Sequence, residues 1–280
     1  MKRFRVVHTT EYSFADDAFN IEVVARLRPR DETAQHCDFF QVVTRPPASI
    51  EDLPVDGFGN HGNLIRFGNR LNRLYISAIS TVTRFQDRAE SAAREGGGPP
   101  EASHASLFMG ETRLVPLSDG IRRYALQSIN PTGSVHDQSE ALCSRIHADL
   151  IFRAGVTDER TTAEEVLAIR QGVCQDFTHL ALACSRSLGW AARYVSGYVH
   201  TAASRGKAHR IATDASHAWL EVFDTSCGWL GLDPANNRRA DDRYIVVARG
   251  RDYDDACPLQ GAFEGGGSQQ LRVSVDVQQI

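Results

Sequence analysis

The sequence lacks the features that mark secreted, membrane-spanning and nucleic-acid-binding proteins. None of its apolar runs approaches the roughly 20 residues that a helix needs to cross a bilayer. The basic residues that follow Met1 are not succeeded by the apolar stretch of a secretory leader. The net charge is −4, so no excess of Lys and Arg would draw the chain to nucleic acid or to an anionic membrane. These absences predict a cytoplasmic protein without nucleic-acid or membrane partners.

The cysteines also lack the spacing of a metal site. No two of them form a C-x-x-C pair, which argues against a zinc cluster. An even number permits disulfides, but a long chain without a secretory leader favours free thiols in a reducing compartment. We therefore expect neither disulfides nor a bound metal. The six are Cys37, Cys143, Cys174, Cys184, Cys227 and Cys257.

Local composition divides the 280 residues into three parts. Residues 1–88 hold β-branched and aromatic runs between turn residues, which predicts a small antiparallel β domain. Residues 89–106 join three glycines to two prolines without a periodic apolar face, which predicts a linker or mobile loop. Residues 107–280 predict helices followed by strands, the pattern of an α+β layer with an antiparallel sheet. The strand-like runs are 4–8, 21–27, 39–43 and 74–82 in the first part, and 192–199, 218–223, 228–232, 244–248 and 271–277 in the last.

The sheet to which the last strand-like run belongs stays open, and the predicted helix starts rest on local capping signals. The run 271–277 alternates apolar and polar residues and could extend either sheet. Helix starts are indicated by a cap at Ser118, by a periodic apolar face from about Asp137, and by the capping-box spacing of Thr162 and Glu165.

Cys174 stands at the start of a further predicted helix. Phe177, Leu180, Cys184 and Leu188 follow it with helical period and share one face. The unpaired N–H groups and the positive dipole end of a helix start stabilise an anion, and the thiolate is the form that attacks a carbonyl carbon. The alternative is that Cys174 is one more buried thiol, as free cysteines usually are. The choice depends on whether the chain supplies partners.

His217 and Asp233 are the partners that the sequence offers. A thiol nucleophile needs a base to take its proton and a third group to orient that base. If the loop between the two strands is 224–226, Phe223 faces Cys227 and the ladder places His217 opposite Asp233, with Cβ atoms about 4.5–5.5 Å apart. Each residue alone also fits a structural role, a histidine in a strand and an aspartate in a turn.

Other residues near Cys174 are weaker candidates for the base. His179 lies five residues further along the same predicted helix, about 7.5 Å along its axis, and reads as a packing residue. His200 and His209 lie in or beside a polar loop and can be merely solvated. Asp176 reads as an early-helix acid favoured by the dipole, and its negative charge would oppose thiolate formation.

Four blocks of sequence carry these residues in order: 172–177, 192–198, 216–222 and 228–234. Together they resemble the core domain of the transglutaminase-like superfamily, a far more specific signal than a lone motif. Residues 28–30 (Arg-Pro-Arg) and 56–60 (Asp-Gly-Phe-Gly-Asn) are similar to the N-terminal β region of bacterial members. Residues 250–253 (Gly-Arg-Asp-Tyr) resemble a stretch that follows the core in those proteins.

The resemblance implies a papain-like α+β core in which Cys174 lies on a helix packed against a sheet that carries His217 and Asp233. It implies a thioester on Cys174 formed from a peptide or side-chain amide, without an organic cofactor or metal. Hydrolysis of that thioester, as in a cysteine protease or amidase, is the leading expectation. The alternatives are transfer to an amine, as in a transglutaminase, and a non-catalytic peptide-binding module.

Several properties are left open by the sequence. The backbone N–H of Cys174 is a natural oxyanion donor, but the second donor is not identified, and Gln171 and nearby aromatic residues are candidates. The oligomeric state and the role of the N-terminal β domain carry no residue-level argument. The expected partner is a peptide or protein substrate.

Overall fold

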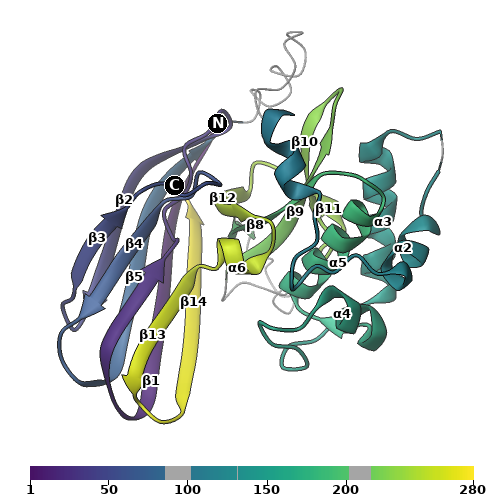
Figure 1. Ribbon diagram of the computed structural model, residues 1–280. Coiled ribbons are helices and arrows are strands. Elements are labelled where there is room, and N and C mark those ends of the chain that lie inside the picture. The colour runs from purple at the N-terminus through teal and green to yellow at the C-terminus, as the bar shows by residue number, and fades with distance from the viewer. Residues whose placement is uncertain (86–101, 131, 202–215) are drawn as a thin grey trace, which may run out of the picture.

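The computed structural model describes residues 1–85, 102–130, 132–201 and 216–280. It contains a β-rich part, to which both ends of the chain contribute, and a mixed part of helices and strands beside it (Figure 1). The predicted α+β class is confirmed. Most of the predicted linker, 89–106, lies outside the described residues, and its last residues belong to the 3-10 helix η1 (Ala102–Phe108).

The β-rich part is a single antiparallel sheet of seven strands, called here the first sheet. Its strands run in the order β2-β5-β1-β4-β3, and β13 and β14 also pair with β1. The strands are β1 (Lys2–Ala25), β2 (Gln35–Arg45), β3 (Ser49–Leu53), β4 (Gly62–Phe67), β5 (Leu71–Arg84), β13 (Leu259–Gly265) and β14 (Gln269–Gln279).

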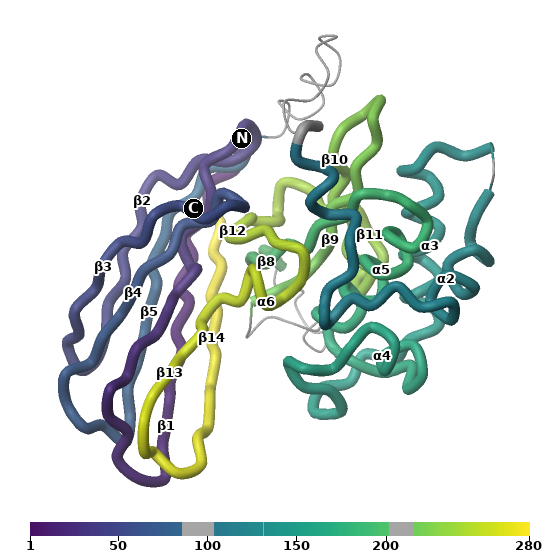
Figure 2. Tube along the Cα trace, viewed as in Figure 1, coloured from purple at the N-terminus to yellow at the C-terminus, as the bar shows by residue number. Residues whose placement is uncertain are grey.

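β1 is the strand on which the first sheet is built. Its N-terminal half lies between β5 and β14, and its C-terminal half lies between β4 and β13 (Figure 2). The runs 4–8 and 21–27 were expected as two strands, but they belong to one strand as far as Ala25. The reason is that the inward alternation of the first run continues as far as Tyr12 and Phe14, which are buried in the same core as Ile21 and Val23, and the pairing resumes at Ala18 after the exposed residues 15–17.

The C-terminal end of the chain differs from the predicted domain boundary. Residues 107–280 were expected as one unit, with the run 271–277 assigned to neither sheet. β13 and β14 pair with β1 along most of its length, so residues after 258 belong to the first sheet and not to the mixed part. The mixed part is therefore inserted between β5 and β13.

The mixed part contains a five-stranded antiparallel sheet, called here the second sheet, in the order β11-β10-β9-β8-β12. The predicted strands of this part are all present. They are β8 (Ala192–Val199), β9 (His217–Asp224), β10 (Gly228–Asp233) and β12 (Tyr244–Gly250), with the short β11 (Arg238–Arg239) in addition. A separate parallel pair is formed by β6 (Ile151–Phe152) and β7 (Gln171–Gly172).

The helices of the mixed part begin largely where the sequence indicates. Ser118 and Thr162 are N-caps, and Thr162 makes the predicted capping box. The helix expected from about Asp137 begins at Val135, because Ser134 is its cap and Asp137 closes the box from inside the helix. The helices are α2 (Asp119–Leu126), α3 (Val135–Asp149), α4 (Ala163–Ile169), α5 (Cys174–Ser187) and α6 (Tyr253–Ala256).

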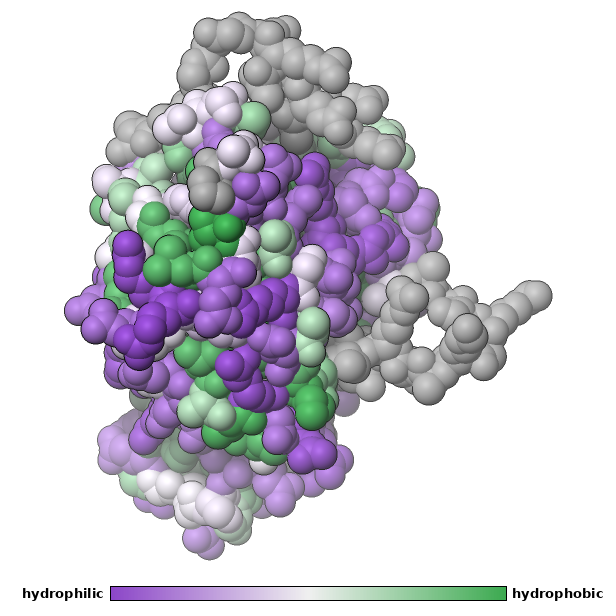
Figure 3. All heavy atoms as spheres, turned by 90° about the vertical axis from the view of Figure 1, so that its right-hand side faces the viewer, coloured by the Kyte–Doolittle hydropathy of each residue, from purple (hydrophilic) through white to green (hydrophobic). Residues whose placement is uncertain are grey.

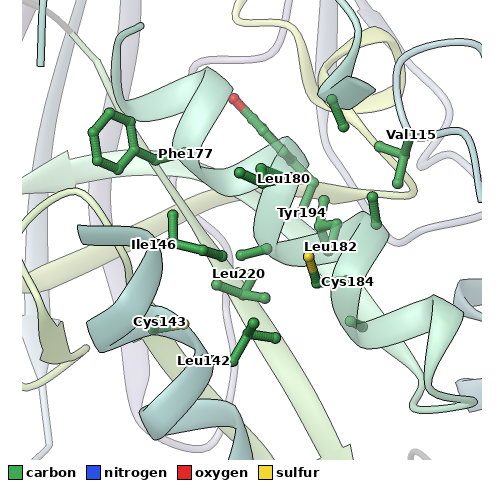
Figure 4. Close-up of a cluster of buried hydrophobic side chains, with 14 of the residues drawn as sticks. Val115, Leu142, Cys143, Ile146, Phe177, Leu180, Leu182, Cys184, Tyr194 and Leu220 are labelled. Carbon is green, nitrogen blue, oxygen red and sulfur yellow. The ribbon is translucent and has the colours of Figure 1, made fainter. Parts of the chain in front are cut away.

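α5 is the central helix of this part and packs against the second sheet. Phe177, Leu180 and Cys184 turn toward a core to which α3 and β9 also contribute (Figure 4). Leu220 of β9 lies in the same cluster, and full burial of such a side chain contributes about 1.5–3 kcal/mol. This core fixes the height and angle at which the start of α5 meets the sheet.

A second apolar cluster joins the two sheets. Phe4 and Val6 of β1 pack with Tyr198 of β8 and Ile245 of β12. The face of the molecule that carries the helices is mostly hydrophilic, with smaller apolar areas between (Figure 3). Among the described residues, no helix is long and apolar enough to cross a membrane.

Candidate active site

The Cys174 side chain is placed by the tight turn that begins α5. Cys174 is the first helical residue, and Val173 before it has an extended backbone. Asp176 closes the turn, because its Oδ2 accepts the Val173 N–H at 2.7 Å and the Thr157 hydroxyl at 2.7 Å. A Cβ at Gly172 would lie 2.5 Å from that oxygen, so the close approach requires glycine here. The N–H of Cys174 therefore lies among those that have no acceptor inside the helix.

Asp176 thus has a structural role that the sequence only partly indicates. It was expected as an early-helix acid, and it is one, but it is also 1% exposed. Burial raises the pKa of this carboxyl, against the opposing effect of its hydrogen bonds from Val173 and Thr157.

His217 and Asp233 meet as predicted, although through a different strand register. Nε2 of His217 lies 2.7 Å from Oδ2 of Asp233, and both residues are buried, with 4% and 0% of their surface exposed. The ladder pairs Asp224 with Gly228 and Phe223 with Trp229, so the expected pairing of Phe223 with Cys227 is wrong. The loop is one residue later than predicted, at 225–227.

The error in register did not separate the two side chains because it equals two residues. A shift of two preserves the face of the sheet on which each side chain lies. His217 and Asp233 become diagonal neighbours across the hairpin, and the next pair after Leu232 and Leu220 places Asp233 beside Trp219. Diagonal neighbours remain within reach of long side chains.

Asp233 accepts hydrogen bonds at both carboxylate oxygens. Asn236 donates to Oδ1 through its backbone N–H at 3.0 Å and to Oδ2 through Nδ2 at 2.7 Å. The Tyr244 hydroxyl donates to Oδ2 at 2.8 Å. Burial would raise the pKa of this carboxyl, but the charge of His217 and these hydrogen bonds outweigh burial and lower it.

Neither Asn236 nor Tyr244 was singled out from the sequence. Asn236 follows Asp233-Pro234 in what reads as an ordinary turn, and Tyr244 opens a predicted strand without any polar marker. A hydrogen bond that joins residues 233 and 244 depends on how β10 and β12 lie in the sheet, which local patterns do not contain.

Nδ1 is the ring nitrogen of His217 that remains for the thiol, because Nε2 lies against Asp233. Among the described residues, Nδ1 is buried and has no partner that meets hydrogen-bond geometry. Cys174 and Asp233 both influence the pKa of the ring. Burial would lower the pKa of His217, but the charges of Asp233 and Cys174 and their hydrogen bonds raise it to about 10. Trp219 lies against the ring at a centroid distance of 6.3 Å. The site is thus set to hold a proton on the imidazole between the thiol and the carboxylate.

The alternative bases do not have this environment. His179 is fully buried and accepts the Tyr253 N–H at 3.2 Å, and burial lowers its pKa to about 3. His200 is half-buried beside Phe4, with ring centroids 5.3 Å apart, and burial lowers its pKa. His209 lies outside the described residues. The Oε1 of Gln171 accepts from Arg153 at 3.0 Å, a bond that does not use its Nε2–H donors, so its role as an oxyanion donor stays a prediction.

The remaining thiols and acids do not assemble a second centre of this kind. The six cysteines are free, and Cys174 is half-buried whereas Cys227 is exposed and the other four are buried. Within the part of the chain that the structure describes, no three His, Cys, Asp or Glu side chains are grouped so that they could hold a metal ion.

A thiol at a helix start, an imidazole beside it and a carboxylate behind the imidazole, on an α+β core, define the papain-like class of folds. The family model of the transglutaminase-like superfamily matches residues 122–234, and that of the bacterial transglutaminase-like N-terminal region matches residues 4–83. The chain belongs to the transglutaminase-like superfamily and carries the N-terminal region of its bacterial members.

Individual relatives extend over the whole chain. An uncharacterized protein of Mycobacterium tuberculosis strain H37Rv is 36% identical over 291 residues, which cover 98% of this chain and 92% of the relative. An uncharacterized protein of Mycobacterium leprae is 28% identical over 284 residues, with 100% of both chains covered. The crystal structure of a candidate cysteine protease from Cytophaga hutchinsonii has a TM-score of 0.78 at 19% identity, covering 100% of this chain and 91% of that one. Members of the superfamily are typically cysteine-dependent enzymes.

Proposed function

We propose that this protein is a thiol-dependent acyl-transfer enzyme that cleaves peptide or side-chain amide bonds through a thioester on Cys174. The observation that carries the proposal is the continuous arrangement of Cys174, His217 and Asp233, with the imidazole fixed at 2.7 Å from the carboxylate. Membership of a superfamily of cysteine-dependent enzymes supports it. The substrate is a peptide or protein.

The first half of the reaction forms the thioester. His217 holds the proton of the Cys174 thiol, and the sulfur attacks the carbonyl carbon of the amide. The oxygen of the tetrahedral intermediate lies near the Cys174 N–H, which is free to donate to it at the start of α5. The C–N bond then breaks as His217 gives its proton to the leaving amine, which leaves an acyl group on sulfur.

The second half releases the acyl group. Water attacks the thioester carbon, His217 takes the proton of that water, and the C–S bond breaks to give a carboxylic acid and the free thiol. Asp233 stays an acceptor in both halves, so it fixes the imidazole tautomer and stabilises its cation. The hydrogen bonds from Asn236 and Tyr244 keep this carboxylate ionised and in place.

Water is the proposed acceptor, and the structural likeness to a candidate cysteine protease supports that choice. The superfamily also contains enzymes whose acceptor is an amine, for which the second half would form a new amide in place of an acid. Access of water to the thioester decides between them. A location in the cytoplasm and the absence of nucleic-acid and membrane partners remain predictions.

The test follows the acyl group by mass spectrometry. A glutamine-containing peptide is incubated in ¹⁸O water, with and without a primary amine, and the label in the acid and the yield of new amide are measured. Hydrolysis incorporates ¹⁸O into the product, whereas transfer gives the amine adduct in place of the labelled acid. Cys174→Ala should lose both products, and Cys227→Ala, which removes the exposed thiol, should lose neither. Substantial turnover by Cys174→Ala would contradict the proposal.

A further inference from the structure

Side chains of the N-terminal β region satisfy the open edge of the second sheet. β12 is its edge strand. The Gln35 amide donates to Val246 O at 2.8 Å and accepts the Val246 N–H at 2.8 Å. The Asn60 amide donates to Arg249 O at 2.7 Å and accepts the Arg249 N–H at 2.8 Å. Both amides are buried, with 1% and 2% exposure. Two side chains thus take the place that a neighbouring strand would occupy.

The conspicuous motifs of the N-terminal region converge on these two amides. The Arg30 N–H donates to Val246 O at 3.1 Å, and its guanidinium donates to Asn60 Oδ1 at 2.8 Å. Asp56 Oδ1 accepts the N–H of Phe58 and of Asn60, each at 2.9 Å, which shapes the loop that presents Asn60. Residues 28–30 and 56–60 therefore both contribute to the hydrogen bonds that hold β12.

A buried chain of charges runs across the same contact. Arg249 of β12 donates to both Glu221 oxygens, at 2.8 and 2.9 Å, and to Glu32 of the N-terminal region at 2.5 Å. Glu221 lies on β9, on the same face as His217 because four residues separate them. The first sheet is thereby tied to the strand that carries the imidazole as well as to β12.

β12 contacts Asp233, the carboxylate of the candidate active site, through its first residue. Its first residue, Tyr244, donates to Asp233 Oδ2 at 2.8 Å, and its ring packs edge-on against Trp219 at 5.2 Å. A Cβ at Gly197 would lie 2.1 Å from Ile245 O, so β8 leaves no room for β12 to move inward. A strand that is blocked on one side and bonded by Gln35 and Asn60 on the other holds the Tyr244 hydroxyl on Asp233.

We propose that the N-terminal β region positions the reaction centre, because Gln35 and Asn60 fix β12 and β12 holds Tyr244 on Asp233. The inference rests on the proposed function, since it gives these residues the task of orienting His217 through its carboxylate. Gln35, Asn60 and Tyr244 are positioning residues. They act on the reaction through Asp233.

A double-mutant cycle tests the connection. Gln35→Met removes the two bonds that the Gln35 amide makes to Val246, at similar volume, and leaves the bond from the Arg30 N–H. Tyr244→Phe removes only the hydroxyl that donates to Asp233. A hydrogen bond to a charged group corresponds to about a tenfold or greater factor, so Tyr244→Phe should lower kcat about tenfold with little change in KM. Because the hydroxyl lowers the pKa of Asp233, its loss should move the acid limb of activity to higher pH. Gln35→Met should act in the same direction, and the double variant should be no slower than Tyr244→Phe.

Two further variants separate positioning from general loss of stability. Asn60→Leu should behave like Gln35→Met. Asn63→Leu is the matched control, because Asn63 is a buried amide of the same region that bonds Asp52 at 2.6 Å. It should lower the unfolding midpoint and leave the acid limb unchanged. If Gln35→Met does not fold, Gln35→Glu, which still accepts the Val246 N–H, is measured in its place.

The readouts distinguish failure of this inference from failure of the proposed function. The pH profile of Cys174 alkylation by iodoacetamide is measured alongside kcat and KM, and it requires no amide substrate. Rate losses that multiply in the double variant, or an unchanged acid limb in both profiles for Gln35→Met, would overturn the inference. A wild-type protein that is alkylated at Cys174 with the expected coupling but turns over no amide would count against the proposed function alone.

Discussion

Replacing Asp233 by Asn is the sharpest test of how the site holds its proton. The substitution keeps the shape of the side chain and removes its charge. Asp233 is fully buried and lies 2.7 Å from Nε2 of His217. Without the carboxylate, burial is the largest remaining influence on the imidazole, and burial lowers its pKa.

The magnitude follows from the pKa of His217, which the site raises from 6.5 to about 10. A difference of this size corresponds to about 5 kcal/mol of stabilisation of the imidazolium. The cation is favoured below pH 10 and is lost as the pH rises through that value. Cys174 supplies part of the effect, so we assign Asp233 about 4 kcal/mol, or about a thousandfold in rate. The alkaline limb of the kcat profile should move to lower pH by about 3 units.

The assay is the pH profile of Cys174 alkylation by iodoacetamide, with the modified residue identified by mass spectrometry, together with kcat on an amide substrate. Asp224→Asn is the matched control, since Asp224 lies at the far end of β9 and accepts from Ser226 at 2.8 Å. Its profile should match that of the wild type. A kcat profile whose alkaline limb stays near pH 10 in Asp233→Asn would refute the assignment of Asp233 as the residue that orients and charges His217.

Three further results are expected from the packing of the molecule. Gly197→Ala should lower the free energy of unfolding by about 1–3 kcal/mol, because its Cβ would lie 2.1 Å from Ile245 O. An unchanged denaturant midpoint would mean that β12 can move away without cost, against this prediction. Burial lowers the pKa of His8 from 6.5 to about 4, so between these pH values the unfolded chain binds a proton at this residue and the folded chain does not. The free energy of unfolding should therefore fall by about 3 kcal/mol as the pH is lowered from 6.5 to 4. His8→Gln should remove this dependence in unfolding experiments at different pH, and a dependence that persists would assign it to another group. Glu221→Gln should cost about 3–5 kcal/mol, because it leaves two buried arginines without their shared carboxylate; a thermal midpoint equal to that of the wild type would contradict this reading.

The sequence was most informative where the determining interactions are local. The caps at Ser118 and Thr162 and the start of α5 at Cys174 depend on residues within one turn, and the structure has them where they were expected. The pairing of His217 with Asp233 was also anticipated, since both flank one hairpin. The predicted register was nevertheless wrong by two residues, because the composition of a turn does not specify which residue closes it.

The sequence was least informative where distant segments meet. Tyr244 reaches Asp233 although β8 and β9 lie between β12 and β10 in the second sheet, and nothing within either segment indicates the other. The placement of residues 271–277 remained open for the same reason. An alternating strand shows which residues point inward, but not which strand pairs with it.

The pairing of β1 has a consequence for the synthesis of the protein. β1 precedes the strands of the second sheet along the chain, whereas two of the strands that flank it, β13 and β14, follow them. The strands of the second sheet pair among themselves, so they can associate while the chain is still growing. Closure of the first sheet must then join segments more than two hundred residues apart, which is the kind of pairing that folds slowly. A nascent chain would therefore contain Cys174, His217 and Asp233, and the residues that hold β12, before β14 could pair with β1 and close the first sheet.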